Sequence, residues 1–292
     1  MVQTAKKILG VKKAGHIGTL DPMAEGILPI CLDRATRIIQ FLASLAKVYQ
    51  AEMVLGAATD TQDATGQVIA TGNPENITEE QIRSVFKDFT GEQTQIPPMF
   101  SAKKNKGIPL YKLARNGITI DRKPVSIHIP SLEFIKKEGN RVEFEVHCSA
   151  GTYIRTLCHD IGRELGCEAH MGRLIRTQVG SFGLKTSLTP EALGKAVADG
   201  TVSSRLIAVE EALSFLPEIR IKKSFISSIA NGIAPSKSSL ETFPRQFKPG
   251  MNLRVSNVSH PLLAIVEPVV DQDAFAQLLP REVAFKLKRV LI

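Results

Sequence analysis

The spacing of apolar residues predicts a succession of short helices and strands. Near the start of the chain, apolar positions recur every three or four residues, which indicates one face of a helix: Val2, Ala5, Ile8 and Leu9. Residues 26–32 form a short apolar run between turn-forming residues, which predicts a single buried strand. Asp33 is placed to cap a following helix, whose apolar positions are Ala35, Ile38, Ile39, Leu42 and Leu45.

Two stretches alternate apolar and polar residues, as half-buried strands do. The first runs from Val48 to Leu55 and directs Tyr49 inward, and the second runs from Val142 to Cys148. Two amphipathic helices are also expected. One begins at a capping box, Thr78 to Gln81, and the other carries the apolar stripe Ile154, Leu157, Cys158, Ile161 and Leu165. Arg155 lies off this stripe in the first turn, where the helix dipole disfavours a cation.

Residues 97–125 break this regularity, with four prolines, two glycines and no sustained period. Asp121 is their only acid, so they carry +6 of the chain's formal +8, and their basic residues are Lys103, Lys104, Lys106, Lys112, Arg115, Arg122 and Lys123. A long basic loop with Phe100 and Tyr111 interleaved fits a segment that clamps a nucleic-acid backbone. A solvated surface loop is the alternative.

From about Pro217 onward, short apolar runs and turn-forming residues alternate, which predicts a small all-β appendage. No apolar run is long enough to span a membrane, and the first residues lack an export signal, so we expect a cytoplasmic protein. The four cysteines favour reduced thiols, and the pair Cys167-x-x-His170 alone does not make a metal site. No phosphate-binding glycine loop is present, so no cofactor is expected.

The stretch GHIGTLDP places Asp21 between a permissive glycine, Gly18, and a proline that favours extended backbone. Such a loop can present a carboxylate, although an Asx turn or a helix cap would also explain it. Arg155 could keep that carboxylate ionised. Tyr49 could transfer a proton or stack on a base, and His16 could stack or donate a hydrogen bond.

Several segments together resemble the TruB family of tRNA pseudouridine synthases. They are GHIGTLDPMAEGILPICLDRATR, Lys47-Val48-Tyr49, Thr59-Asp60-Thr61-x-Asp63-x-x-Gly66, Ile96-Pro97-Pro98-x-Phe100-Ser101-Ala102 and Gly151-Thr152-Tyr153-Ile154-Arg155-Thr156. Their order, spacing and residue types agree over roughly Val2 to Phe182. Members normally begin with a strand bearing a Lys-Pro-x-Gly-x-x-Ser motif, whereas this sequence starts within the helix that follows it.

The resemblance implies an α+β fold with a mixed, largely antiparallel sheet and flanking helices, followed by a small β-rich, PUA-like domain. The expected division is a catalytic domain over 1–216, with the basic insertion 97–125, and an RNA-binding domain over 217–292. The resemblance makes Asp21 the catalytic aspartate, Arg155 its partner and Tyr49 the active-site tyrosine. His16, Tyr153 and Leu174 are implied to contact the flipped-out nucleotide.

The implied reaction converts uridine 55 in the T loop of tRNA to pseudouridine, with Asp21 attacking either C6 of the uracil or C1′ of the ribose. It needs no metal, redox cofactor or nucleotide. The T-stem loop of tRNA is the expected partner, and a monomer without an obligatory protein partner is expected. Three alternatives remain: a non-catalytic tRNA-binding or tRNA-folding module, a hydrolase acting on nucleosides, and a guide-RNA-dependent relative.

Overall fold

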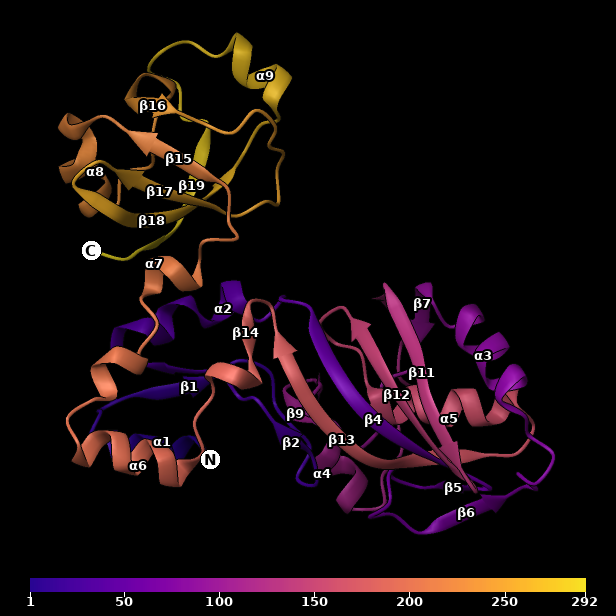
Figure 1. Cartoon of the computed structure of the whole chain (residues 1–292). Helices are drawn as coiled ribbons and strands as arrows, with labels where there is room; N and C mark the ends of the chain where they lie inside the picture. The colour runs from indigo at the N-terminus through magenta and orange to yellow at the C-terminus, as the bar shows by residue number, and fades with distance from the viewer. The chain divides into compact units, whose positions relative to one another are not determined.

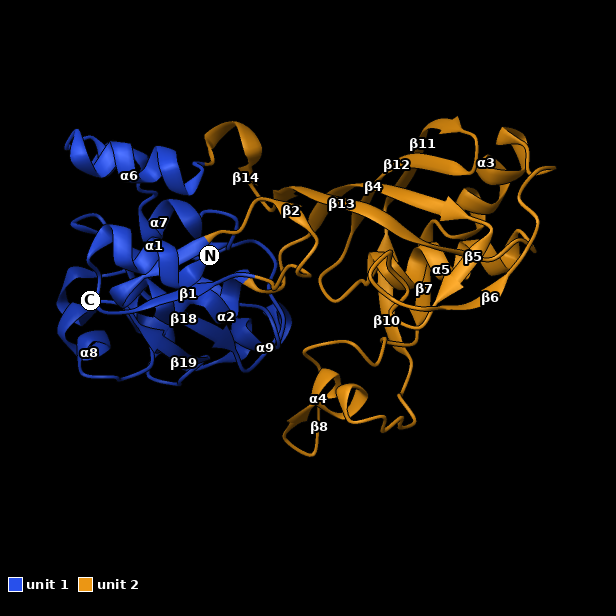
Figure 2. Ribbon diagram, turned by 90° about the horizontal axis from the view of Figure 1, so that it is seen from below, with its two compact units in different colours: residues 1–17, 30–42, 188–292 blue, residues 18–29, 43–187 orange.

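A computed structural model describes residues 1–292, and they divide into two compact units. Figure 2 colours unit 1, which comprises residues 1–17, 30–42 and 188–292, in blue, and unit 2, which comprises 18–29 and 43–187, in orange. The chain therefore passes from unit 1 to unit 2 twice, and the first passage falls inside GHIGTLDP, after Ile17. The domain boundary at 216/217 stays a prediction.

Unit 2 is built on a six-stranded, largely antiparallel sheet. The order along the sheet is β11 (Ser131–Glu138), β12 (Arg141–Cys148), β4 (Lys47–Leu55), β13 (Ala169–Val179) and β14 (Phe182–Gly183), and the short β2 (Glu25–Gly26) pairs in parallel with β13. Figure 1 shows β4 between β12 and β13. The two neighbours of the central β4, which are β12 and β13, both come from much later in the chain.

Two helices cover one face of this sheet and close its core. Helices α3 (Glu79–Asp88) and α5 (Ile154–Glu164) contribute Ile82, Phe86, Leu157 and Ile161, which pack with the inward residues of β4 and β12. The alternation predicted for both strands is confirmed: Tyr49 and the residues that follow it at every second position of β4 are buried. The capping box that begins α3 is also present, with Thr78 and Gln81 each bonding the other's backbone N–H.

The rest of unit 2 consists of small pairs of strands and one short helix. β5 (Ala57–Thr59) pairs with β6 (Val68–Thr71), and β7 (Gly91–Gln95) pairs with β10 (Val125–Ile129). Between β7 and β10, the basic insertion forms a hairpin of β8 (Lys104–Asn105) and β9 (Ile108–Pro109), followed by α4 (Leu110–Arg115). Figure 2 shows α4 and β8 in a lobe that projects beyond β10. A short 3-10 turn, η2 (Leu184–Thr186), ends the unit.

Unit 1 combines the start of the chain with its last third. Helix α1 (Val2–Leu9), predicted from the apolar spacing, contacts α6 (Pro190–Ala198). The larger sheet of unit 1 has five strands, in the order β16 (Leu240–Thr242), β15 (Glu218–Ile221), β17 (Leu253–Asn257), β18 (His260–Pro268) and β19 (Phe285–Val290). The expectation of β-rich structure after Pro217 is therefore confirmed. The remaining short helices are η3 (Val202–Arg205), α7 (Val209–Ala212), η4 (Lys223–Phe225), α8 (Ile226–Ala230), η5 (Lys237–Ser239) and α9 (Gln272–Gln277).

Two expectations for residues 26–45 are wrong. The single strand expected over 26–32 is two short strands in different sheets, since β2 pairs with β13 whereas β3 (Ile30–Leu32) pairs with β1 (Ala14–His16). The helix expected after Asp33 is a 3-10 helix, η1 (Asp33–Ile38), followed by one turn of α-helix, α2 (Ile39–Leu42). Asp33 does not cap it. Its carboxylate accepts a hydrogen bond from the Lys13 N–H across the β1–β3 pair instead.

Candidate active site

Asp21 lies in the loop between β1 and β2, at a cavity of about 680 Å³ formed by unit 2. The Pro22 turn that follows is closed by the Ala24 N–H, which donates to the Asp21 carbonyl. The side chain of Asp21 is 32% exposed, so its carboxylate is accessible from the cavity. A cavity of this size fits a ligand as large as one nucleotide.

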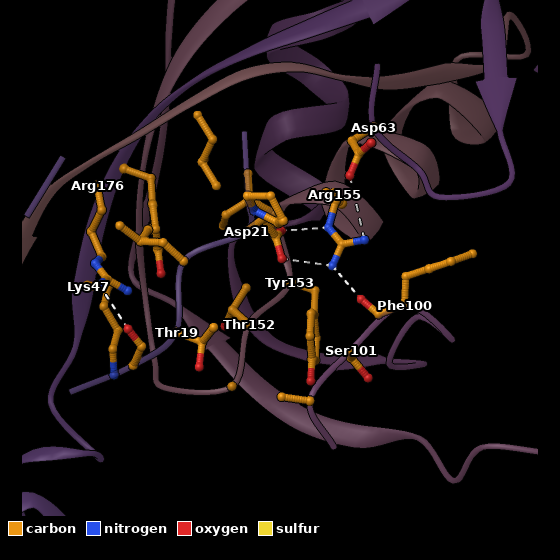
Figure 3. Close-up of a pocket in the computed structure, with 18 of the residues that line it drawn as sticks. Thr19, Asp21, Lys47, Asp63, Phe100, Ser101, Thr152, Tyr153, Arg155 and Arg176 are labelled. Carbon is orange, nitrogen blue, oxygen red and sulfur yellow. Dashed lines mark hydrogen bonds and ion pairs between the residues drawn. The ribbon is translucent and has the colours of Figure 1, made fainter. Parts of the chain in front are cut away.

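Arg155 is the partner of Asp21, although 134 positions separate the two residues. Its Nε lies 2.7 Å from Oδ2 of Asp21, and its Nη2 donates to Oδ1 at 3.1 Å, as Figure 3 shows. Helix α5 positions this side chain, which is only 4% exposed. Arg155 was predicted to lie off the apolar stripe of α5. In the structure its guanidinium lines the wall of the cavity and does not face bulk solvent.

The same guanidinium also holds two backbone segments. Nη1 donates to the Thr61 carbonyl at 2.9 Å, and Nη2 donates to the Phe100 carbonyl at 2.8 Å. Asp63 is a second carboxylate beside it, with Oδ2 3.7 Å from Nη1. Its Oδ1 accepts hydrogen bonds from Thr61 and Thr65, so Asp63 is fixed among hydroxyls while Asp21 remains open to the cavity.

Opposing effects act on the pKa of Asp21. Burial raises the pKa, the Arg155 charge and hydrogen bond lower it, and the nearby Asp63 raises it slightly, so that the net direction is upward from 3.8. Without Arg155, only the two raising effects would remain. The ion pair therefore keeps a carboxylate available in a site that would otherwise favour its protonated form.

Three other predicted residues line the same cavity: Tyr49, Tyr153 and Leu174. Tyr49 is buried on β4, and burial raises the pKa of its hydroxyl even though the Arg176 charge lowers it. Tyr153 precedes α5, and the Gln95 side chain both accepts from its N–H and donates to its carbonyl. The structure thus brings together five of the six proposed catalytic and nucleotide-contacting residues.

His16, the sixth, lies in β1 and belongs to unit 1. Its contact with the nucleotide stays a prediction. Its Nδ1 is buried without a hydrogen-bond partner in the structure.

The seven basic residues of the insertion are placed in two ways. Six are exposed: Lys103, Lys104, Lys106, Lys112, Arg115 and Lys123. Arg122 is half-buried, and its Nη1 donates to the Pro97 carbonyl at the other end of the insertion. Only Arg115 lines the cavity, where its guanidinium lies over the ring of Tyr111. Their role as contacts to an RNA backbone stays a prediction.

The sequence analysis assigned no role to three residues that help to form the site: Asp63, Gln95 and Arg176. Arg176 is fully buried on β13 and lines the cavity beside Lys47. Two bulges in β13, at Gly172 and Thr177, shift its inward positions, so alternation counted from Met171 misses Arg176, whereas alternation counted from Leu174 reaches it. An arginine two positions after a buried leucine in a strand was the available signal.

Two further observations concern the cysteines and the lengths of the helices. All four cysteines are buried and unpaired. No helix of the chain is both long and apolar enough to cross a membrane.

Proteins of known structure share the fold of this chain. Among solved structures, a Cbf5–Nop10–Gar1 complex matches with a TM-score of 0.81 and 28% identity, covering 100% of this chain and 80% of the matched chain. An H/ACA ribonucleoprotein bound to a substrate RNA containing 2′-deoxyuridine matches with a TM-score of 0.77 and 27% identity, over 100% of this chain and 80% of the other. The fold is therefore that of a pseudouridine synthase.

The sequence comparisons specify the family. The model of the TruB family pseudouridylate synthase N-terminal domain matches residues 6–154, and that of the tRNA pseudouridylate synthase B C-terminal domain matches residues 155–214. Proteins named tRNA pseudouridine synthase B are similar over most of the chain. That of Syntrophotalea carbinolica is 43% identical over 236 residues, 81% of this chain and 77% of its own. That of Pelotomaculum thermopropionicum is 39% identical over 272 residues, 91% and 86% respectively.

The chain belongs to the TruB family of pseudouridine synthases. It is an isomerase that converts uridine to pseudouridine in tRNA. The two similar synthases, from Syntrophotalea carbinolica and Pelotomaculum thermopropionicum, are bacterial. The match to solved structures confirms the expected fold class.

Proposed function

We propose that this enzyme isomerises uridine 55 in the T loop of tRNA and that Asp21 is its nucleophile. The observation that carries the proposal is the partly exposed Asp21 carboxylate at the cavity, paired with the buried Arg155 guanidinium at 2.7 Å. A nucleophilic carboxylate must be ionised, and an opposite charge at this distance favours ionisation.

The reaction rearranges bonds within one nucleotide. The bond between N1 and C1′ breaks, C5 bonds to C1′, C5 loses a proton, and N1 gains one, so the product is an isomer of uridine. Asp21 adds to an electrophilic carbon of this nucleotide, either C6 of the uracil or C1′ of the ribose, and is released when the new bond has formed. No oxidant or reductant is consumed.

The target nucleotide must leave the stacked loop to reach Asp21, at a cost of a few kcal/mol. Tyr49, Tyr153 and Leu174 surround the position it would occupy, and aromatic rings can replace the lost stacking. The basic insertion would hold the backbone of the T arm, so that recognition depends on RNA shape and affinity falls as salt rises.

We further propose that the protein acts in the cytoplasm as a monomer, without an obligatory protein partner. All five residues named above that meet at the cavity are supplied by this chain. The test is to supply the purified chain with a minimal T-arm hairpin. Pseudouridine formed by the chain alone supports the proposal, and a requirement for a guide RNA or another protein contradicts it.

The nucleophile is tested with Asp21→Asn on a tRNA transcript, followed by digestion and quantification of pseudouridine. Asp88→Asn is the matched control, because it removes an exposed carboxylate at the end of α3. We expect Asp21→Asn to bind the transcript but form no product, and Asp88→Asn to retain the full rate. Pseudouridine formation by Asp21→Asn would contradict the proposed role of Asp21 as the nucleophile.

Two controls separate the other functions. A transcript with cytidine at position 55 should yield no product if that is the modified position. A wild-type protein that binds tRNA without product would be a binding module, and release of free uracil would identify a hydrolase.

A further inference from the structure

Arg176 is a fully buried arginine near the centre of the sheet of unit 2, and the proposed reaction gives it no step. An arginine is retained in such a place only where its donors are satisfied, because burying an unpaired charge is very costly. The partners of Arg176 therefore indicate its purpose.

Its guanidinium holds both ends of the loop that carries Asp21. Nε donates to the Ile27 carbonyl at 2.9 Å, and Nη2 donates to the Gly18 carbonyl at 3.0 Å. Asp21 lies between these two anchoring points. Neutral carbonyls receive both bonds, so the charge of Arg176 is not used to pair a carboxylate.

The backbone of Arg176 secures the same loop at a third point. Its carbonyl accepts from the Ile27 N–H at 2.9 Å, where β2 lies in parallel beside β13. Gly26 fits directly against this backbone, since a Cβ there would lie 2.2 Å from the Arg176 oxygen. The far end of the loop is therefore clamped from two sides by one residue.

Arg176 also faces Tyr49, its cross-strand neighbour on β4. Both side chains line the cavity, together with Lys47. Burial raises the pKa of the Tyr49 hydroxyl, and the neighbouring Arg176 charge opposes this increase. One side chain thus contacts the loop of the nucleophile and the tyrosine of the site.

We propose that Arg176 is a positioning residue that sets the location of Asp21 by fixing the Gly18 and Ile27 carbonyls, while orienting Tyr49. The inference rests on the proposed role of Asp21. Its planar fork explains why an arginine is needed, because one guanidinium reaches carbonyls in different directions, whereas the ammonium of a lysine is a compact point charge. A nucleophile displaced by about 1 Å can lose on the order of 100-fold in rate.

The test compares Arg176→Lys with Arg173→Lys. Arg173 lies on the same strand and bonds Glu25 of the same loop, but its side chain is 63% exposed. We expect Arg176→Lys to lower kcat by about 100-fold and to change the KM and the Kd for tRNA by less than about twofold, because the loop, rather than the RNA surface, has moved. Arg173→Lys should match the wild type in all three quantities.

Tyrosine fluorescence establishes the folded fraction before each assay, because the chain has no tryptophan and its three tyrosines, Tyr49, Tyr111 and Tyr153, all lie in unit 2. A purely structural role for Arg176 predicts a lower resistance to urea with a wild-type kcat per folded molecule. That result, or an equal change in KM and kcat, would overturn the proposal. An inactive wild type would instead refute the proposed function.

A second variant decides the question if Arg176→Lys does not fold. Gly18→Ala keeps Arg176 but places a Cβ 3.3 Å from its Nη1, at a φ of +71°. Gly139→Ala is the control for the backbone strain alone, since Gly139 has a φ of +59° with open space around it. A kcat for Gly18→Ala within threefold of Gly139→Ala contradicts the clamp, and a lower kcat with unchanged Kd supports it.

Discussion

Replacing Arg155 by methionine should destabilise unit 2, because this side chain joins three separate segments. Methionine leaves the Thr61 and Phe100 carbonyls without the donors that now lie at 2.9 and 2.8 Å. Each of these two half-buried acceptors costs about 1–2 kcal/mol when left unsatisfied, the lower part of the usual range. The side chain of Asp21 is 32% exposed and can be rehydrated, so the lost ion pair adds little. We expect the free energy of unfolding to fall by about 2–4 kcal/mol.

The assay is urea denaturation followed by tyrosine fluorescence, which reports on unit 2 alone. Arg163→Met is the matched control, because it removes the same charge from an exposed position of α5. An exposed substitution of this kind usually changes stability by less than about 0.5 kcal/mol. A loss for Arg155→Met within about 1 kcal/mol of the control would refute the reasoning.

Arg155→Met should also change the pH dependence of the reaction. Burial raises the pKa of Asp21, and Arg155 opposes this increase. Without the arginine the pKa rises further, so the carboxylate is lost at a higher pH and the acid side of the rate profile moves upward. Single-turnover rates measured between about pH 5 and 9 with saturating tRNA test this shift. An unchanged profile would show that Arg155 does not control the ionisation of Asp21.

Three further predictions follow from other contacts. The pKa of Asp21 is raised in the folded state, so its stabilising contribution is complete below the unfolded pKa and is lost as pH rises through the folded pKa. Asp21→Asn should therefore be more stable than the wild type at neutral pH. Urea curves at pH 4 and 8 should show that the difference in stability grows with pH. Gly26→Ala should lose about 3 kcal/mol or more, because its Cβ would meet the backbone of Arg176 at 2.2 Å, whereas Gly139→Ala should lose far less; equal urea midpoints would contradict the contact. The four cysteines are buried, and burial raises the pKa of the Cys31 and Cys148 thiols to about 11, so a thiol reagent at pH 8 should react only after urea is added; rapid labelling of the native protein would be inconsistent with their burial.

The elements that the sequence predicts correctly are those specified by local interactions. The capping box at Thr78 and the alternation through Tyr49 are short-range patterns, and both are present because neighbouring residues suffice to form them. The prediction for residues 26–32 was wrong because the two ends of this apolar run pair with strands of two different sheets. Local periodicity carries no information about which partner strand is adjacent.

The candidate site divides in the same way. The motif around Asp21 and the arginine at the start of α5 are visible in the sequence, and the family resemblance implies their roles. Their pairing across 134 positions, and the burial that opposes it, depend on how β4, β13 and α5 assemble. Arg176 shows the limit most clearly, because its carbonyl partners, Gly18 and Ile27, lie 158 and 149 positions away in the sequence. The sequence by itself determined which groups are available for catalysis, whereas the tertiary structure decided which of them meet, since the contacts that position them are long-range.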